Sequence, residues 1–367
     1  MSEILAEVRN GTGFITLNRP KALNALSLDM IRALSAALLA WRDDAAVQAV
    51  AIRGMGKDPA SPGGTAPFGI FCAGGDIRFF HQAVFAGDPA LEDFFTEEYK
   101  LNHLIHNYPK PYIAFLDGIV MGGGMGISQG SRLRIVTGRT KMAMPETNIG
   151  LFPDVGGGYF LGRCPGRLGE YLALTGVVIG AQEALAAGLA DLAVDASELA
   201  GLWAALEADG LACVQRLQQQ AASKSIAGND LLTRGLAQID HYFALQSVPA
   251  IIAALEADAS PWAVDTAAIL RKRSPLMLHV VLEQVRRGRA MSLADDLRME
   301  RDMVRNCFRL RPGAASETVE GIRAAVVDKD HSPKWSPQRI EDVTPEMVAP
   351  FFASPWPPFA HPLRELA

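Results

Sequence analysis

Short apolar runs alternate with helical patterns in the first half of the chain, and this alternation constrains the fold more than any other feature. The runs have β-like patterning and are predicted strands: Glu7–Leu17, with a hairpin turn at Asn10-Gly11, Ala49–Arg53, Tyr112–Leu116 and Leu133–Val136. Between the first two runs, Ser27 can cap a helix that extends through Trp41. Strands separated by helices predict an α/β fold with βαβ crossovers and a largely parallel sheet.

The second half of the chain is helical and ends in a proline-rich segment. Ser274-Pro275 opens a predicted helix that Gly288 closes, and Ser292 opens another with a buried stripe through Phe308. Eight of the 22 prolines lie in residues 331–367, which disfavours continuous helix and predicts an extended surface tail. The expected domains are an α/β core at 1–195, a helical region at 196–330 and this tail at 331–367.

The composition excludes several classes of function. The net charge of −5 over 367 residues, without a basic cluster, argues against nucleic acid as a partner. The four cysteines are far apart, so the sequence predicts neither disulfides nor a zinc site, and no metal is expected. No 18-residue apolar run and no signal-like start occur, so we expect a cytoplasmic protein that does not bind membranes.

Two glycine clusters follow or flank predicted strands: Cys72-Ala73-Gly74-Gly75-Asp76 and Met121 to Gly126. Glycine lets backbone N–H groups approach a ligand, and two converging N–H groups would form an oxyanion hole; tight turns without a ligand are the alternative. Neither cluster matches a dinucleotide-binding or P-loop motif. Gly126 to Gly130 fits the G-x-S-x-G pattern of a nucleophile elbow, but the preceding glycines favour a helix through Ser128.

A third segment, Met144 to Gly158, contains two carboxylates, Glu146 and Asp154, among apolar residues and glycines. Desolvation in such surroundings could raise a carboxyl pKa and suit the group to acid–base or nucleophilic chemistry. A helix-capping Glu and a turn Asp remain the alternative. The breaker-rich segment Gly54 to Gly69 predicts a mobile loop.

Together these segments resemble the crotonase (enoyl-CoA hydratase/isomerase) superfamily. The resemblance rests on four motifs in order: Asn18 to Leu26, Phe71 to Ile77, Asp117 to Gly124, and Pro145-Glu146. It implies a crotonase-like spiral of ββα units, a CoA thioester substrate, and an oxyanion hole from the N–H groups of Gly75 and Gly123. It also implies that five residues hold the CoA nucleotide: Lys21, Ala22, Leu23, Ala73 and Asp76.

Further motifs are similar to those of the 3-hydroxyisobutyryl-CoA hydrolase subgroup of this superfamily. They include Phe95 to Tyr99, Tyr108 to Ala114, Ala143 to Tyr159, Glu320 to Ala324 and Asp328 to Trp335. Hydratases of the superfamily carry two catalytic glutamates, and this chain keeps only Glu146, with Gly126 at the other position. The resemblance therefore implies hydrolysis of a short hydroxyacyl-CoA, foremost 3-hydroxyisobutyryl-CoA in valine catabolism.

In that reading Glu146 acts as nucleophile or as general base, Asp154 binds the substrate hydroxyl or assists proton transfer, and Glu98 binds substrate. No cofactor is expected, because CoA is part of the substrate. A hydratase or isomerase of the same fold and a catalytically silent acyl-CoA-binding protein remain the alternatives. The sequence leaves the oligomeric state open, with a homo-oligomer as one possibility.

Overall fold

A computed structural model describes residues 2–58, 64–223 and 230–367. The described part of the chain separates into two compact units, each assembled from three stretches of sequence. Unit 1 comprises Met1–Gly75, Lys100–Ala143 and Val178–Leu232. Unit 2 comprises Asp76–Tyr99, Met144–Val177 and Thr233–Ala367.

The main sheet of unit 1 runs in the order β1-β2-β3-β6-β8-β10. β1 and β2 form the predicted antiparallel hairpin, and each later neighbour pairs in parallel. The strands are β1 (Ile4–Arg9), β2 (Thr12–Leu17), β3 (Ala49–Gly54), β6 (Tyr112–Leu116), β8 (Leu133–Thr137) and β10 (Leu192–Val194). The predicted α/β class and largely parallel sheet are confirmed.

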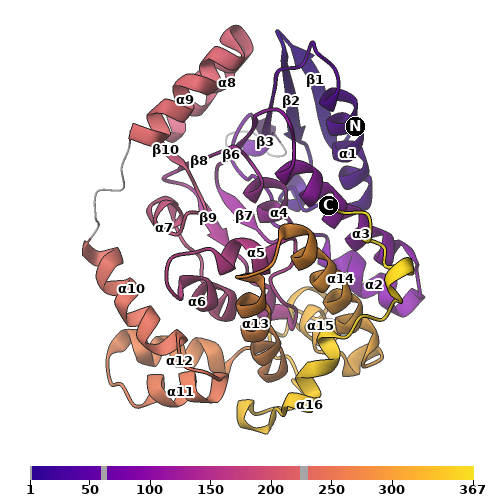
Figure 1. Cartoon of the computed structure of the whole chain (residues 1–367), viewed down its shortest axis with the longest axis vertical. Coiled ribbons are helices and arrows are strands. Elements are labelled where there is room, and N and C mark those ends of the chain that lie inside the picture. Colours follow the sequence, from indigo (N-terminus) through magenta and orange to yellow (C-terminus); the bar gives the residue numbers. More distant parts are fainter. Residues whose placement is uncertain (1, 59–63, 224–229) are drawn as a thin grey trace. The chain divides into compact units, whose positions relative to one another are not determined.

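Unit 1 also contains helices and a small second pair of parallel strands (Figure 1). They are α1 (Leu28–Arg42), α4 (Gly123–Gln129), α7 (Ala181–Ala186), α8 (Leu199–Asp209) and α9 (Leu211–Ser223), with a parallel pair of β7 (Ile119–Met121) and β9 (Lys141–Ala143). Ser27 caps α1 by accepting a hydrogen bond from Met30 N–H at 3.2 Å, as predicted. Trp203 of α8 packs on Phe14 and Phe115 of the sheet, with ring centroids 4.8 and 5.3 Å apart, and so α8 covers one face.

The segment predicted as a loop between β3 and Phe71 contains regular structure. β4 (Gly56–Asp58) and β5 (Gly64–Ala66) pair in antiparallel register. Gly56 and Gly69 lie so close that a Cβ on Gly69 would be 2.8 Å from the Gly56 Cα, which explains glycine at both positions. Residues 59–63, the centre of the predicted mobile loop, lie outside the described residues.

Unit 2 is built from helices, and two of them begin at the predicted serine caps. They are α2 (Ile77–Ala86), α5 (Gly157–Gly162), α6 (Leu168–Thr175), α10 (Asp230–Phe243), α11 (Val248–Glu256), α12 (Pro261–Arg271), α13 (Pro275–Gly288), α14 (Leu293–Arg309), α15 (Glu317–Ile322) and α16 (Pro345–Val348). α3 (Ala90–His106) begins in unit 2 and ends in unit 1. Ser274 caps α13 and Ser292 caps α14, which confirms both predicted helix starts.

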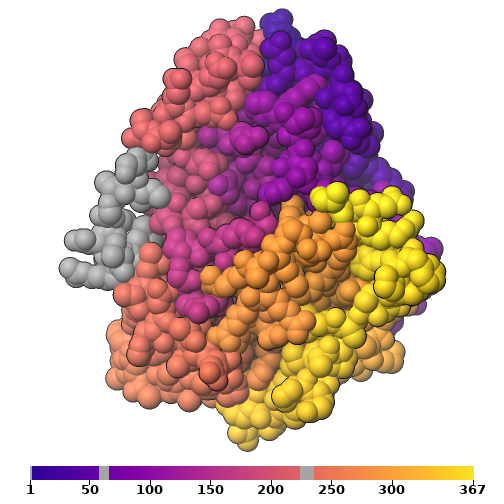
Figure 2. Space-filling model, viewed as in Figure 1, coloured from indigo at the N-terminus to yellow at the C-terminus, as the bar shows by residue number. Residues whose placement is uncertain are grey.

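The proline-rich segment 331–367 contains short helical turns rather than uninterrupted extended chain, because proline is tolerated in the first turn of a helix. Figure 2 shows it, in yellow, on the surface of the unit. Asn306 of α14 anchors it by donating to the carbonyl oxygens of Pro350, Phe351 and Ala353 at 2.9–3.0 Å. Phe351 and Leu363 are buried, so this segment is part of the packing of unit 2.

Candidate active site

Three predicted carboxylates come together in unit 2. Glu98 lies on α3, Glu146 begins a 3-10 helix at Glu146–Ile149, and Asp154 lies in the loop before α5. Their side chains are buried, with exposed fractions of 2%, 7% and 6%. Among the described residues, Glu98 Oε1 and Glu146 Oε2 are buried atoms without a hydrogen-bond partner. Native proteins rarely leave such oxygens unpaired, so these two atoms are available to a ligand or a water molecule.

Burial dominates the electrostatics of this carboxylate cluster. Desolvation, followed by the charge of Asp154, raises the pKa of Glu146 well above its usual value. Desolvation and the charges of Asp154 and Glu146 do the same for the pKa of Glu98. Desolvation raises the pKa of Asp154 to about 6, although a hydrogen bond from Tyr99 opposes the shift. The three groups thus interact electrostatically, and burial favours the protonated form of each carboxyl more than water does.

Tyr99 binds one member of the cluster, Asp154, and the sequence did not indicate this role. Its hydroxyl donates to Asp154 Oδ2 at 2.9 Å. The neighbouring Phe95 fixes this part of α3 by packing on Phe80 and Phe308, with ring centroids 4.9 and 5.8 Å apart. The aromatic residues of the Phe95 to Tyr99 motif therefore hold the polar face of α3 toward Asp154.

The Glu146 turn is shaped by glycine and by α15. Gly150 ends the turn with φ +64°, and its carbonyl oxygen accepts a hydrogen bond from Thr318 Oγ1 at 2.6 Å. A Cβ on Gly321 would lie 2.3 Å from the Ile149 backbone, so α15 packs directly on the turn. The position of Glu146 consequently depends on residues more than 160 positions away in the sequence.

The loop that carries Asp154 contacts two polar residues that sequence reasoning missed, Gln284 of α13 and Glu300 of α14. Both side chains are fully buried. Glu300 lies between Leu297 and Val304 on the stripe predicted to be apolar. An acid in an apolar helix stripe was the sequence signal that could have revealed it.

In unit 1 the two predicted glycine segments lie against each other. Gly74 adopts φ +106°, and a Cβ on it would be 3.8 Å from the backbone nitrogen of Gly123. Gly122 has φ +48°, and Gly123 is the first residue of α4, where backbone N–H groups have no helical acceptor. A Cβ on Gly124 would lie 2.5 Å from the Cys72 carbonyl oxygen, so glycine is required for this approach.

The predicted CoA-binding residues divide between the units. Lys21 and Ala22 form a 3-10 turn that Leu23 ends with φ +56°, and the Leu23 carbonyl oxygen accepts from the Ala73 N–H at 3.1 Å. These four residues therefore lie together in unit 1. Asp76 belongs to unit 2, where its side chain caps α2 by accepting from Phe79 N–H at 3.3 Å.

Ser128 is not a nucleophile elbow. It lies inside α4, is buried, and its hydroxyl donates to the Gly124 carbonyl oxygen at 2.8 Å. The predicted helix through Ser128 is confirmed. On the same helix Gly126 is buried and offers no side chain at the position where hydratases were expected to have a glutamate. Among the described residues, no group of three or more His, Cys, Asp or Glu is arranged to hold a metal ion.

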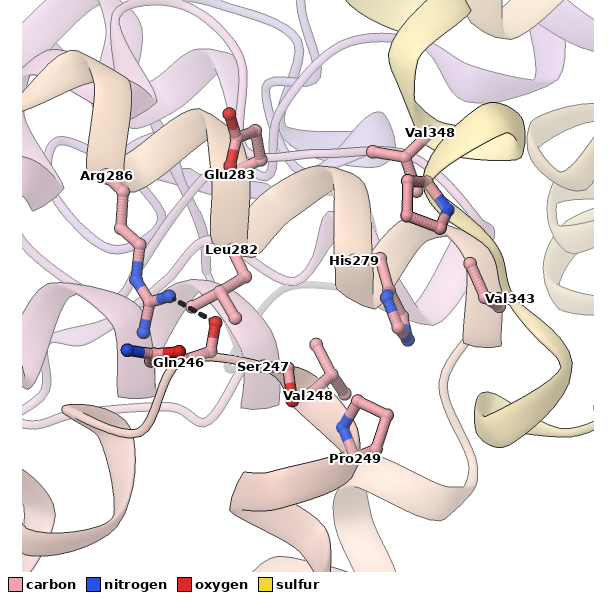
Figure 3. Close-up of a pocket in the computed structure, with 11 residues that line it drawn as sticks. Gln246, Ser247, Val248, Pro249, His279, Leu282, Glu283, Arg286, Val343 and Val348 are labelled. Atoms are coloured by element: carbon pink, nitrogen blue, oxygen red, sulfur yellow. Dashed lines mark hydrogen bonds between the residues drawn. The ribbon is translucent and has the colours of Figure 1, made fainter.

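A cavity of about 410 Å³ lies elsewhere in unit 2 (Figure 3). It is lined by the start of α11, one face of α13 and residues of the C-terminal segment, including Val248, His279 and Val343. Arg286 at its edge donates to the Gln246 carbonyl oxygen at 2.7 Å. None of the sequence-predicted site residues lines this cavity.

Comparison with known proteins identifies the family of the chain. The family model for enoyl-CoA hydratase/isomerase matches residues 12–352. The chain belongs to this family. The predicted resemblance to the crotonase superfamily is confirmed, and it extends from the α/β unit through the C-terminal helices.

The proteins most similar to this chain include a hydrolase, a dehydratase and a hydratase by name. The 3-hydroxyisobutyryl-CoA hydrolase of Xenopus tropicalis is 41% identical over 93% of this chain and 86% of its own. A crystal structure of a carnitinyl-CoA dehydratase from Mycobacterium thermoresistibile is 38% identical, with a TM-score of 0.83 over 96% of this chain and 97% of its own. A crystal structure of an enoyl-CoA hydratase from Rhodobacter sphaeroides 2.4.1 is 37% identical, also with a TM-score of 0.83, over 96% and 98%. These two matches confirm the crotonase-like fold over 96% of the chain.

The name of the Xenopus tropicalis relative also includes the word mitochondrial. In the part of this chain that the structure describes, no helix combines the length and apolar character needed to cross a membrane. A cytoplasmic location for this family member stays a prediction.

Proposed function

We propose that this protein hydrolyses a short hydroxyacyl-CoA thioester, foremost 3-hydroxyisobutyryl-CoA, as a step of valine catabolism. The observation that carries the proposal is the buried carboxylate cluster, in which Glu146 keeps an unpaired oxygen beside Glu98 and Asp154. The curated relative named 3-hydroxyisobutyryl-CoA hydrolase supports the same substrate. No cofactor is required, since CoA belongs to the substrate.

Glu146 is the catalytic carboxylate in this proposal. In its ionised form it either attacks the thioester carbonyl carbon and forms a transient anhydride or removes a proton from the attacking water. Burial raises its pKa, which makes the ionised form a stronger base. The thiolate of CoA is a good leaving group, so a carboxylate is a sufficient nucleophile for this substrate.

Asp154 and Glu98 serve the hydroxyl end of the substrate and its proton transfers. The hydrogen bond from Tyr99 favours the ionised form of Asp154, and in that form Asp154 can accept a hydrogen bond from the substrate hydroxyl. Glu98 has a pKa raised well above its usual value, so its protonated form can donate to a substrate oxygen. Substitution of Asp154 by Asn should therefore reduce activity on the hydroxylated substrate.

The glycine segments of unit 1 provide the oxyanion hole in this proposal. The N–H groups of Gly75 and Gly123 would stabilise the tetrahedral oxyanion, each with on the order of 3 kcal/mol in the transition state. The adjoining turn of Lys21, Ala22 and Leu23, with Ala73 and Asp76, would hold the CoA nucleotide. The contact between Leu23 and Ala73 supports this assignment for unit 1.

A hydratase or isomerase activity is the second candidate, because the solved structures with TM-scores of 0.83 are named a carnitinyl-CoA dehydratase and an enoyl-CoA hydratase. Gly126 argues against it. Hydration needs one group for water and another for the α-carbon proton, and glycine at this buried helical position provides neither.

One assay tests the proposal. The protein is incubated with 3-hydroxyisobutyryl-CoA and with crotonyl-CoA while free thiol and the enoyl chromophore are followed. We expect thiol release from the first substrate, and in a folded Glu146→Gln variant a loss of at least about 1,000-fold in kcat, because the amide is neither nucleophile nor base.

Loss of the chromophore without thiol release would establish the hydratase reading instead. Binding without either change would make the protein an acyl-CoA-binding module. Substantial thiol release by Glu146→Gln would remove Glu146 from the mechanism, even if the hydrolase activity itself were found.

A further inference from the structure

The segment Pro153–Gly158 comprises the loop that carries Asp154 and the first two residues of α5. One hydrogen-bond network holds this segment on both sides of Asp154. Glu300 of α14 accepts from the Gly156 N–H at 2.7 Å and from the Gly158 N–H at 2.9 Å. Gln284 of α13 donates to the Pro153 carbonyl oxygen at 2.6 Å and to Glu300 Oε1 at 3.0 Å. The two side chains thus connect the residue before Asp154 to the residues after it.

Glycine makes this arrangement possible. Gly156 precedes α5 with φ +89° and has no side chain to cap the helix, so α14 supplies the acceptors for the first N–H groups. Asp296, one turn before Glu300, accepts from the Tyr159 N–H at 2.9 Å. A Cβ on Gly158 would lie 2.3 Å from Asp296 Oδ1, so only glycine admits these carboxylates.

This way of capping a helix carries an electrostatic cost that an ordinary cap avoids. Desolvation, the charge of Asp296 and the charge of Asp154 together raise the pKa of Glu300 well above its usual value. A serine cannot replace this cap, because a side chain at position 156 would be strained at φ +89° and its Cβ would lie 3.0 Å from Leu293 Cδ1. Glu300 therefore caps α5 and, through its hydrogen bond with Gln284, is also linked to the backbone before Asp154.

We propose that Gln284 and Glu300 are positioning residues that fix the backbone on both sides of Asp154 and thereby aim its carboxylate at the substrate. This inference rests on the proposed function, since it concerns how the Asp154 used there is held. Tyr99 fixes the Asp154 side chain directly, at 2.9 Å, while Gln284 and Glu300 act through the main chain. α13 and α14 belong to the helical region that follows the α/β segments, so this region takes part in shaping the site.

Two variants test the proposal. Glu300→Gln keeps the side-chain shape but turns an NH₂ group toward one of the two loop N–H donors, and one hydrogen bond is lost. Gln284→Leu removes the donor to Pro153. We expect kcat for thiol release to fall on the order of 10- to 100-fold in each, with KM changed less than about threefold, because a small displacement of a reacting group mainly affects the transition state.

A second measurement does not depend on activity. Amide hydrogen exchange at Gly156, Gly158 and the start of α5 should become faster in both variants. The matched control is Asp302→Asn, the same type of change on the same helix, where the carboxylate accepts from Ser354 Oγ at 2.9 Å. We expect the control to leave kcat, KM and exchange in the loop unchanged.

Unchanged kcat in folded Glu300→Gln and Gln284→Leu would overturn the positioning role. An equal fall in kcat for Asp302→Asn would also overturn it, since general destabilisation of α14 would then explain the loss. If the unmodified protein releases no thiol, the proposed function fails, and the hydrogen-exchange data alone decide whether Gln284 and Glu300 fix the backbone around Asp154. Faster loop exchange confined to the two variants then supports the positioning network, and unchanged exchange refutes it.

Discussion

The glycine segments of unit 1 and the carboxylate cluster of unit 2 are built in opposite ways. The first offers backbone N–H groups, and the conformations of Gly74 and Gly122 arise within a few residues of the groups they present. The second offers side chains whose positions depend on remote contacts, such as those of Thr318 and Glu300. A backbone site therefore fails through strain at a glycine, whereas a carboxylate site fails through loss of a partner or a change in charge.

The two regions also differ in electrostatic cost. Backbone amides are neutral, and their burial requires only that a ligand or carbonyl accept the hydrogen bond. The carboxylates of unit 2 are desolvated near one another, and their pKa values rise as a result. Unit 2 should consequently be the pH-sensitive part of the molecule.

Among the variants that test this comparison beyond Glu146→Gln, Gly74→Ala has the largest expected effect. Alanine at φ +106° is strained by about 1–3 kcal/mol, and relief of the strain would move the Gly75 N–H relative to Gly123. We expect kcat for thiol release to fall on the order of 100-fold, the effect of losing one oxyanion donor. Steady-state kinetics with a circular-dichroism check of folding measures it.

Gly138→Ala is the control for that variant, because a Cβ on this exposed glycine would meet no atom within 4 Å. It should retain the parent activity. Parent-like kinetics in a folded Gly74→Ala variant would mean that the glycine segments are structural turns, and the contrast between the two regions would disappear.

A smaller effect is expected for Tyr99→Phe, which removes the hydrogen bond to Asp154. This bond lowers the pKa of Asp154, so the pKa should rise above its present value of about 6. The acidic limb of the pH–rate profile would move to higher pH, and activity would fall on the order of tenfold at pH 6 and less at pH 8. A profile of kcat/KM between pH 5 and pH 9 checks the shift.

Tyr242→Phe removes a comparable tyrosine hydroxyl, the one that donates to Asp258 at 2.5 Å, and should leave the profile unchanged. If Tyr99→Phe lowers activity equally at every pH, its hydroxyl does not tune a titrating carboxylate of the cluster.

The smallest effect on activity is expected for Asp296→Asn. This variant tests how much a buried acid lowers the free energy of unfolding of unit 2 as the pH rises. Desolvation raises the pKa of Asp296 to about 7 from its ordinary 3.8. Its protonated form is favoured in the folded state, so its contribution to stability is present at low pH and is lost as pH rises through about 7. Asparagine does not titrate and can still accept from the Tyr159 N–H.

We therefore expect the free energy of unfolding to fall between pH 5 and pH 8 in the parent, and to fall less in Asp296→Asn by on the order of 2 kcal/mol. Urea unfolding at the two pH values measures the difference. The variant of the exposed neighbour, Asp295→Asn, should show the same pH dependence of the free energy of unfolding as the parent. If the parent, Asp296→Asn and Asp295→Asn all show the same dependence, Asp296 does not cause it.

Much of the fold could be predicted because its signals are local. The serine caps at Ser27, Ser274 and Ser292 and the strands β3 and β6 follow from hydrogen-bonding side chains and apolar runs. β7, β9 and β10 were missed because three residues are too few for a strand pattern to be recognised. The β4–β5 pair was missed because glycines are typical of loops and turns rather than of strands.

In the candidate site, too, some residues could be predicted from the sequence and others could not. The motifs identified Glu98, Glu146 and Asp154 as a group, and the structure places these three carboxylates together in unit 2. The sequence did not reveal the role of Tyr99 or the contacts of Gln284 and Glu300, because the partners are separated by 55 to 144 positions.

The α/β class, the family and the residue types available for chemistry could be read from the sequence alone. They depend on short-range patterns and on motifs that are recognisable without coordinates. Three-dimensional packing was needed to show which carboxylates are desolvated together, which oxygen atoms stay unpaired and which helices hold the Asp154 loop. Burial and long-range hydrogen bonds exist only when distant segments pack, and they are what gives an ordinary glutamate an unusual pKa.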